Sequence, residues 1–146
     1  APVVPPTRYC TAKVNSLGCT PQIAVTGFPS IGSGDNFHVG ATQVLNARPG
    51  LLLWGSTSSA NPFGGGTLCV GQPVRRTAAQ TAEDPWNPSF DSCWGSYAFH
   101  FSHAYMQANG LGSGTTVYAQ YWSRDAGFVT PGNICLTDAV QFTLAP

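Results

Sequence analysis

The chain has 146 residues, and only 8% of them are charged, against about 25% in an average soluble domain. Six basic and six acidic residues cancel to a formal charge of zero. Because phosphate binding needs several clustered cations and Arg75-Arg76 is the one adjacent pair, nucleic acid is excluded as a partner. No run of about 18 apolar residues occurs, so we expect no membrane insertion.

The first seven residues, APVVPPT, predict an extended arm ahead of a single domain over residues 8–146. Prolines such as Pro5 and Pro6 hold the chain extended and prevent a helix. Val3 and Val4 are apolar, which favours an arm that lies against its own sheet or against a neighbouring molecule. The alternative is a disordered leader.

Beyond the arm, short runs with strand character are separated by turn clusters rich in glycine and proline. Such spacing is typical of an all-β sandwich or barrel. We therefore predict an antiparallel β-sandwich of two sheets with about eight strands and negligible helix. The expected strands cover residues 9–14, 22–28, 36–42, 51–55, 67–70, 95–107, 116–124 and 139–144.

A long loop over residues 80–94 precedes the longest of these runs. It contains Trp86 and Trp94, and long loops without secondary structure are commonly functional or mobile. Exposed tryptophans there could stack on sugar rings, whereas tryptophans in strands usually fill the core. These two residues are the candidate sugar-binding side chains.

The run over residues 95–107 alternates clearly between aromatic and small side chains. On a strand, Tyr97, Phe99 and Phe101 point to one face. We expect that face to lie in the core together with Phe142 and Leu144 from the last strand.

Five cysteines without metal-ligand spacing predict disulfides, which place the chain in an oxidising compartment. Cys10 and Cys19 flank a short turn, so we expect them to pair across a hairpin, stabilising it by roughly 2–3 kcal/mol. Cys69 and Cys93 are the next natural pair, although other connectivities stay open. Cys135 is then unpaired, either buried and inert or bonded to a neighbouring chain.

Three segments carry a resemblance: RYCTAKVNSLGCTPQIAVTG, LLLWGSTSSANPFGGGTLCVGQPVRRT and VYAQYWSRDAGFVTPGNICLTDAVQFTL. They resemble an uncharacterised secreted β-rich module that recurs in large exported proteins of environmental bacteria such as planctomycetes and myxobacteria. Members often carry further cysteines where this chain has Ala119 and Ala145. The resemblance implies an exported, disulfide-containing β fold; because the family carries no established catalytic residues, it implies nothing about activity.

Catalytic and metal chemistry are not expected. The three histidines are His38, His100 and His103; on a strand, His100 and His103 would point to opposite faces and could not hold one ion together. No G-x-S-x-G nucleophile motif occurs. The neighbouring Glu83 and Asp84 indicate a solvated turn rather than a glycosidase pair. We predict a protein that is not an enzyme and has no cofactor or functional metal site.

Low charge and a nearly lysine-free sequence favour association, because like-charge repulsion and lysines on edge strands both oppose it. The first functional prediction is therefore a structural subunit of an extracellular assembly, a filament or surface layer, formed by self-association through the arm. The alternative is a secreted carbohydrate-binding or adhesion module. The start at Ala1 fits cleavage of a signal peptide, so we expect a secreted protein, outside the cell or on its surface.

Overall fold

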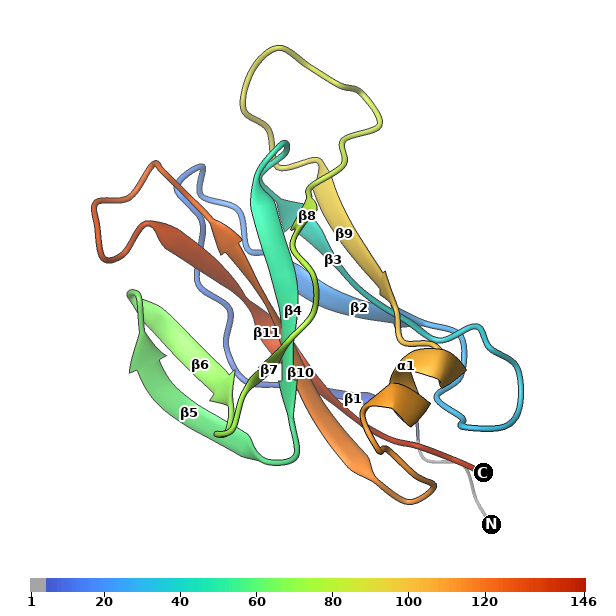
Figure 1. Ribbon diagram of the computed structural model, residues 1–146. Helices are drawn as coiled ribbons and strands as arrows, with labels where there is room; N and C mark the ends of the chain where they lie inside the picture. Colours follow the sequence, from blue (N-terminus) through green and yellow to red (C-terminus); the bar gives the residue numbers. More distant parts are fainter. Residues whose placement is uncertain (1–4) are drawn as a thin grey trace.

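A computed structural model describes residues 5–146 of the chain (Figure 1). These residues form eleven strands and one helix, so the predicted all-β class is confirmed, with more strands than the eight expected. The elements are β1 (Thr7–Tyr9), β2 (Gln22–Thr26), β3 (His38–Val44), β4 (Pro49–Gly55), β5 (Ser58–Phe63), β6 (Gly66–Val70), β7 (Arg75–Arg76), β8 (Gln80–Thr81), β9 (Gly95–His100), α1 (His103–Ala108), β10 (Thr116–Arg124) and β11 (Ile134–Thr143).

The predicted strand over residues 9–14 is wrong beyond Tyr9, because β1 ends there and residues 10–14 form no strand. The three strands that the sequence did not indicate are β5, β7 and β8. β7 and β8 have two residues each, and β5 is almost wholly exposed. None of them shows the alternation of apolar and polar residues by which a half-buried strand is recognised. Their pairing therefore depends on neighbouring strands rather than on their own pattern.

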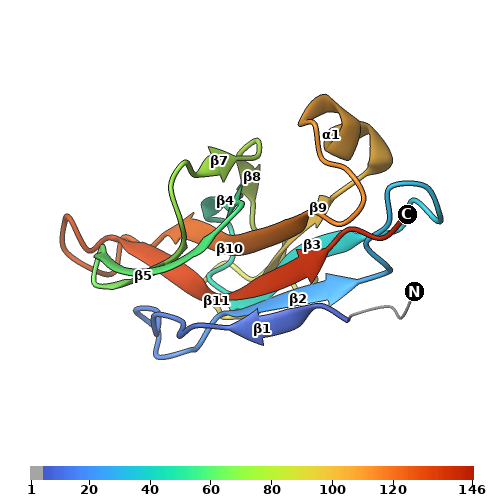
Figure 2. The same ribbon diagram turned by 90° about the horizontal axis from the view of Figure 1, so that it is seen from below.

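The described strands form three antiparallel sheets, where the sequence predicted two. The largest has the order β1-β11-β10-β4-β7, and β8 also pairs with β4. A second sheet has the order β2-β3-β9, and β5 pairs with β6 in a separate hairpin. Figure 2 shows this hairpin and helix α1 on opposite sides of the molecule.

One core joins the largest sheet to the three-stranded sheet. The ring of Tyr97 on β9 stacks on that of Tyr121 on β10, with centroids 5.4 Å apart. The Tyr121 hydroxyl donates a hydrogen bond to the Val39 carbonyl of β3 at 2.7 Å. Both sheets therefore contribute buried side chains to the same apolar cluster.

The predicted strand over residues 95–107 is wrong in its second half. β9 ends at His100, and helix α1 begins after Ser102, whose side chain accepts a hydrogen bond from the backbone N–H of Tyr105. Such capping is a strong local helix signal, and it replaces the strand alternation after Phe101. The expected core positions Tyr97, Phe101, Phe142 and Leu144 are buried, and Phe99 is half-buried against them.

The disulfide pairing differs from the predicted one: Cys10 bonds Cys69, and Cys19 bonds Cys93. The reason is topological. β1 pairs with β11 while β2 pairs with β3, so the segment between them passes from one sheet to the other instead of forming a hairpin. The bonds join residues 59 and 74 apart in sequence, and loops of that size predict about 4 kcal/mol of stabilisation each in the chain-entropy model.

Cys135 lies outside both disulfides and is buried. Its thiol donates a hydrogen bond to the Lys13 carbonyl at 3.2 Å. Burial raises the pKa of the Cys135 thiol to about 11, and the nearby carboxylate of Asp125 adds to the rise. The thiol is therefore protonated and unreactive at neutral pH.

The N-terminal arm is described in part. Val3 and Val4, which were expected to be its docking side chains, lie outside the described residues. Pro5 and Pro6 lead into β1, where Thr7 already pairs with Gln141 of β11. No helix within residues 5–146 has the length and apolarity needed to cross a membrane.

Candidate functional site

The segment over residues 84–95, here called the aromatic loop, projects from one end of the molecule beyond β8 and β9 (Figure 1). Its base is a pair of backbone hydrogen bonds between Glu83 and Ser96, at 3.0 and 2.8 Å. Trp86 is 74% exposed, Phe90 61% and Trp94 52%. The sequence identified both tryptophans as candidates but missed Phe90, whose signal was its place between them in the same loop.

The three rings form one cluster with Trp94 at its centre. The Trp94 centroid lies 6.4 Å from that of Trp86 and 6.2 Å from that of Phe90. The corresponding planes are inclined by 61° and 68°. Edge-to-face contacts of this kind stabilise aromatic pairs. Because the rings are not coplanar, they cannot all lie against one flat surface, and the cluster suits a curved or single-chain ligand.

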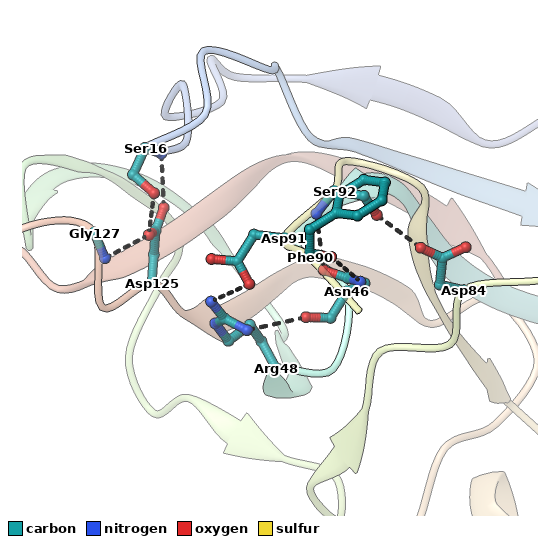
Figure 3. Close-up of polar contacts among 9 residues, drawn as sticks. All are labelled: Ser16, Asn46, Arg48, Asp84, Phe90, Asp91, Ser92, Asp125 and Gly127. Carbon is teal, nitrogen blue, oxygen red and sulfur yellow. Dashed lines mark hydrogen bonds and ion pairs between the residues drawn. The ribbon is translucent and has the colours of Figure 1, made fainter. Parts of the chain in front are cut away.

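The backbone of the loop is held from inside by Asp84. One carboxylate oxygen accepts a hydrogen bond from the Trp86 N–H at 2.9 Å. The other accepts one from the Ser92 hydroxyl at 2.7 Å (Figure 3). The Ser92 hydroxyl in turn accepts a hydrogen bond from the Trp94 N–H at 3.2 Å. Both tryptophans are therefore anchored through their backbone to one carboxylate.

A second set of contacts ties the loop to the turn between β3 and β4. Asn46, which is buried, accepts a hydrogen bond from the Ser92 N–H at 2.9 Å and donates one to the Phe90 carbonyl at 3.2 Å (Figure 3). Arg48 pairs with Asp91 at 3.0 Å. The ion pair is partly exposed and contributes little by itself, so Asn46 is the main anchor on this side.

A third set joins the aromatic loop to two neighbouring loops. The disulfide to Cys19 attaches Cys93 to the turn that Asn15 closes, where the Asn15 side chain accepts hydrogen bonds from two backbone N–H groups at 3.0 Å. The buried carboxylate of Asp125 accepts hydrogen bonds from Ser16 in that turn and from the N–H of Gly127 (Figure 3). Asp125 thus links that turn to the loop after β10.

A polar groove lies at the base of the aromatic loop. Its volume is about 390 Å³, and Glu83 and Ser96, the two residues that close the loop, both line it. Trp94 precedes Ser96 by two residues on the chain that continues as β9. The groove thus offers hydroxyl, amide and carboxylate groups at the base of the loop that carries the exposed rings. The lining residues are Gln80, Thr81, Glu83, Ser96 and Ala98.

The histidines lie elsewhere, near α1. The rings of His38 and His100 stack with centroids 4.5 Å apart, and a ring nitrogen of His100 lies 3.2 Å from the Asp35 carboxylate. The backbone N–H of His103 donates to the same carboxylate and lowers the pKa of Asp35. Within residues 5–146, no three side chains of the metal-binding types converge as a site would require.

Comparison of the chain with protein-family models, with curated proteins and with solved structures gives no match. The resemblance to the exported bacterial module therefore stays a prediction, and the functional argument depends on the geometry of the aromatic loop.

Proposed function

We propose that this protein is an extracellular carbohydrate-binding module, without enzymatic activity, that holds a neutral polysaccharide at the aromatic loop. One observation carries the proposal: the backbone of the loop is held by a disulfide and by the Asp84 and Asn46 contacts, while its three large aromatic side chains stay exposed. A pre-organised loop loses little conformational entropy when a ligand binds.

Sugar chemistry matches the two halves of the site. The C–H faces of a pyranose ring pack on a tryptophan ring, and its hydroxyls need hydrogen-bonding partners at the edge. The rings of Trp86, Phe90 and Trp94 supply the first kind of contact. The groove beside Glu83 and Ser96 supplies the second.

Charge argues against an anionic membrane surface as the ligand. Attraction to anionic lipids requires clustered Lys or Arg. Glu83, Asp84 and Asp91 lie at or beside the aromatic loop, and Arg48 is already paired with Asp91. The same carboxylates disfavour acidic polysaccharides, so we specify a neutral one.

The scaffold and its compartment fit this role. The two disulfides indicate an oxidising, extracellular environment. We infer a secreted protein whose six-stranded and three-stranded sheets pack in a sandwich-like manner and present the aromatic loop at one end.

The test is retention on swollen amorphous cellulose, swollen chitin and insoluble xylan, in which single chains are accessible. The full chain should be retained on at least one of them, and Trp86→Ala and Trp94→Ala should each abolish retention while the near-ultraviolet spectrum of the core stays native. Phe63→Ala is the matched control, because Phe63 is 44% exposed but belongs to the β5–β6 hairpin. Retention on none of the three polymers, or equal loss in Phe63→Ala, would refute the proposal.

Self-association into an extracellular filament or layer is a second proposal, and one observation favours it. The sole lysine, Lys13, does not protect an edge strand, because its ammonium group donates hydrogen bonds to the carbonyls of Gly64, Gly132 and Ile134 at 2.7–2.8 Å. Strand β5 is exposed, has no charged residue and pairs on one side with β6. Such an edge can accept a strand from another copy.

A further inference from the structure

A second candidate site lies on the opposite face of the largest sheet, away from the core. Leu52 and Tyr121 point into the core, so the alternating Leu51, Leu53 and Trp122 point to the other face. The β5–β6 hairpin covers part of this face and leaves a cavity of about 250 Å³. Leu51 and Leu53 of β4 line it, with Leu68 of the hairpin.

Two arginines approach this cavity from strands on either side of β4. β7 pairs with β4 along one edge, where Arg76 lies opposite Leu53. β10 pairs with β4 along the other edge, and Arg124 at its end also lines the cavity. An apolar floor therefore lies between two guanidinium groups.

Neither guanidinium is neutralised by the described part of the chain. Arg8 and Arg48 have acidic partners, Asp138 and Asp91, but within residues 5–146 Arg76 and Arg124 form no ion pair. Arg124 instead lies over the Trp122 ring, 4.8 Å from its centroid. Both arginines are exposed, so their guanidinium groups are open to an anionic partner that binds at this apolar cavity.

We propose that this cavity binds a small amphipathic carboxylate, an alkyl chain that ends in a carboxyl group. The chain would pack on Leu51, Leu53 and Leu68, and the carboxylate would accept hydrogen bonds from both Arg76 and Arg124. Arginine suits this role because its planar guanidinium matches a carboxylate in a bidentate arrangement. A volume of about 250 Å³ lies below that of typical drug-sized pockets, so the ligand is small.

Adjacent arginines on β7 provide a matched control. Successive side chains of a strand point to opposite faces, and Arg75 lies over the Trp54 ring, 5.2 Å from its centroid, and reaches Asn109 at 3.5 Å. Arg75 does not line the cavity. Arg75→Gln therefore removes the same charge from the same short strand without touching the proposed site.

The test is calorimetric titration with decanoate, decanol and decyltrimethylammonium below their micelle concentrations. Decanoate should bind the full chain, decanol should bind at least about tenfold more weakly because it lacks the charge-assisted bonds, and the cation should not bind. Arg76→Gln and Arg124→Gln should each weaken decanoate binding by about tenfold, whereas Arg75→Gln should leave it unchanged.

Three outcomes would overturn the proposal: no decanoate binding at millimolar concentration, equal binding of decanol, or equal loss in Arg75→Gln. Sedimentation of the same samples shows whether a second copy of the chain covers the cavity. That result would also overturn the proposal. The aromatic loop and this cavity share no residue, so Trp86→Ala should leave decanoate binding intact. Failure here and failure of the carbohydrate proposal are thus independent.

Discussion

The Ser92 hydroxyl donates a hydrogen bond to the Asp84 carboxylate at 2.7 Å and so joins the two sides of the aromatic loop near its base. Because the same hydroxyl accepts from the Trp94 N–H, it connects the fixed carboxylate to the central ring of the cluster. The rigidity of the loop, and with it the pre-organisation of the rings, depends on this contact.

Ser92→Ala should therefore weaken polysaccharide retention several-fold. Loss of the two hydrogen bonds should lower the free energy of unfolding by about 1–3 kcal/mol, since Ser92 is buried. Chemical denaturation and binding isotherms measure the two effects. Ser89→Ala is the control, because Ser89 lies in the same loop and is exposed. If Ser92→Ala binds as the unaltered chain does, pre-organisation is not what supports the site.

The two disulfides should differ in function although they resemble each other in stability. Replacing either pair by serines should cost about 4 kcal/mol, as measured by denaturation. Loss of Cys19–Cys93 frees the aromatic loop and should reduce polysaccharide retention in the fraction that is still folded. Loss of Cys10–Cys69, which ties β6 to the segment after β1, should leave it unchanged. Peptide mapping without reduction checks the pairing itself, and a Cys10–Cys19 peptide would contradict it.

Cys135 should make the protein less stable at alkaline pH. Its pKa in the folded protein is about 11, above the ordinary value of 9.0 that applies to the unfolded chain. The folded state thus keeps the proton longer, so the stabilisation is complete below about pH 9 and is lost as pH rises to about 11.

This difference in pKa should lower the free energy of unfolding by about 3 kcal/mol by pH 11. Between pH 8 and 11, the free energy of unfolding should fall more steeply with pH for the unaltered chain than for Cys135→Ala. Chemical denaturation at a series of pH values measures it. The comparison is needed because burial also raises the pKa of Tyr9, to about 12, and that contribution is present in both proteins. Equal slopes, or rapid modification of Cys135 by a thiol reagent at pH 7 in the folded protein, would contradict the prediction.

Self-association can be separated into contributions of the arm and of the sheet edge. If the arm drives assembly, a chain that begins at Thr7 should stay monomeric at concentrations where the full chain associates. If the β5 edge drives it, Asn61→Lys should have that effect, because Asn61 is exposed on β5 and lysine blocks strand addition. Analytical ultracentrifugation measures both variants. A full chain that stays monomeric at high concentration would exclude this proposal.

Local patterns in the sequence were enough to predict the all-β class, the burial of Tyr97 and Phe101, and the oxidising compartment. Alternation and turn residues depend on a few neighbours along the chain, and cysteine usage depends on composition. Trp86 and Trp94 could also be singled out as candidate binding side chains, because a long loop with two large aromatic residues is a local feature.

The disulfide pairing and the arginine-lined cavity depend on contacts between distant segments, so only the tertiary structure decided them. The partner of Cys10 is Cys69 and not Cys19 because β1 and β2 join different sheets. Arg76 and Arg124 come together at one cavity because β7 and β10 both pair with β4. No short-range pattern encodes which strands become neighbours, since that choice is made by the burial of side chains from the whole chain in one core.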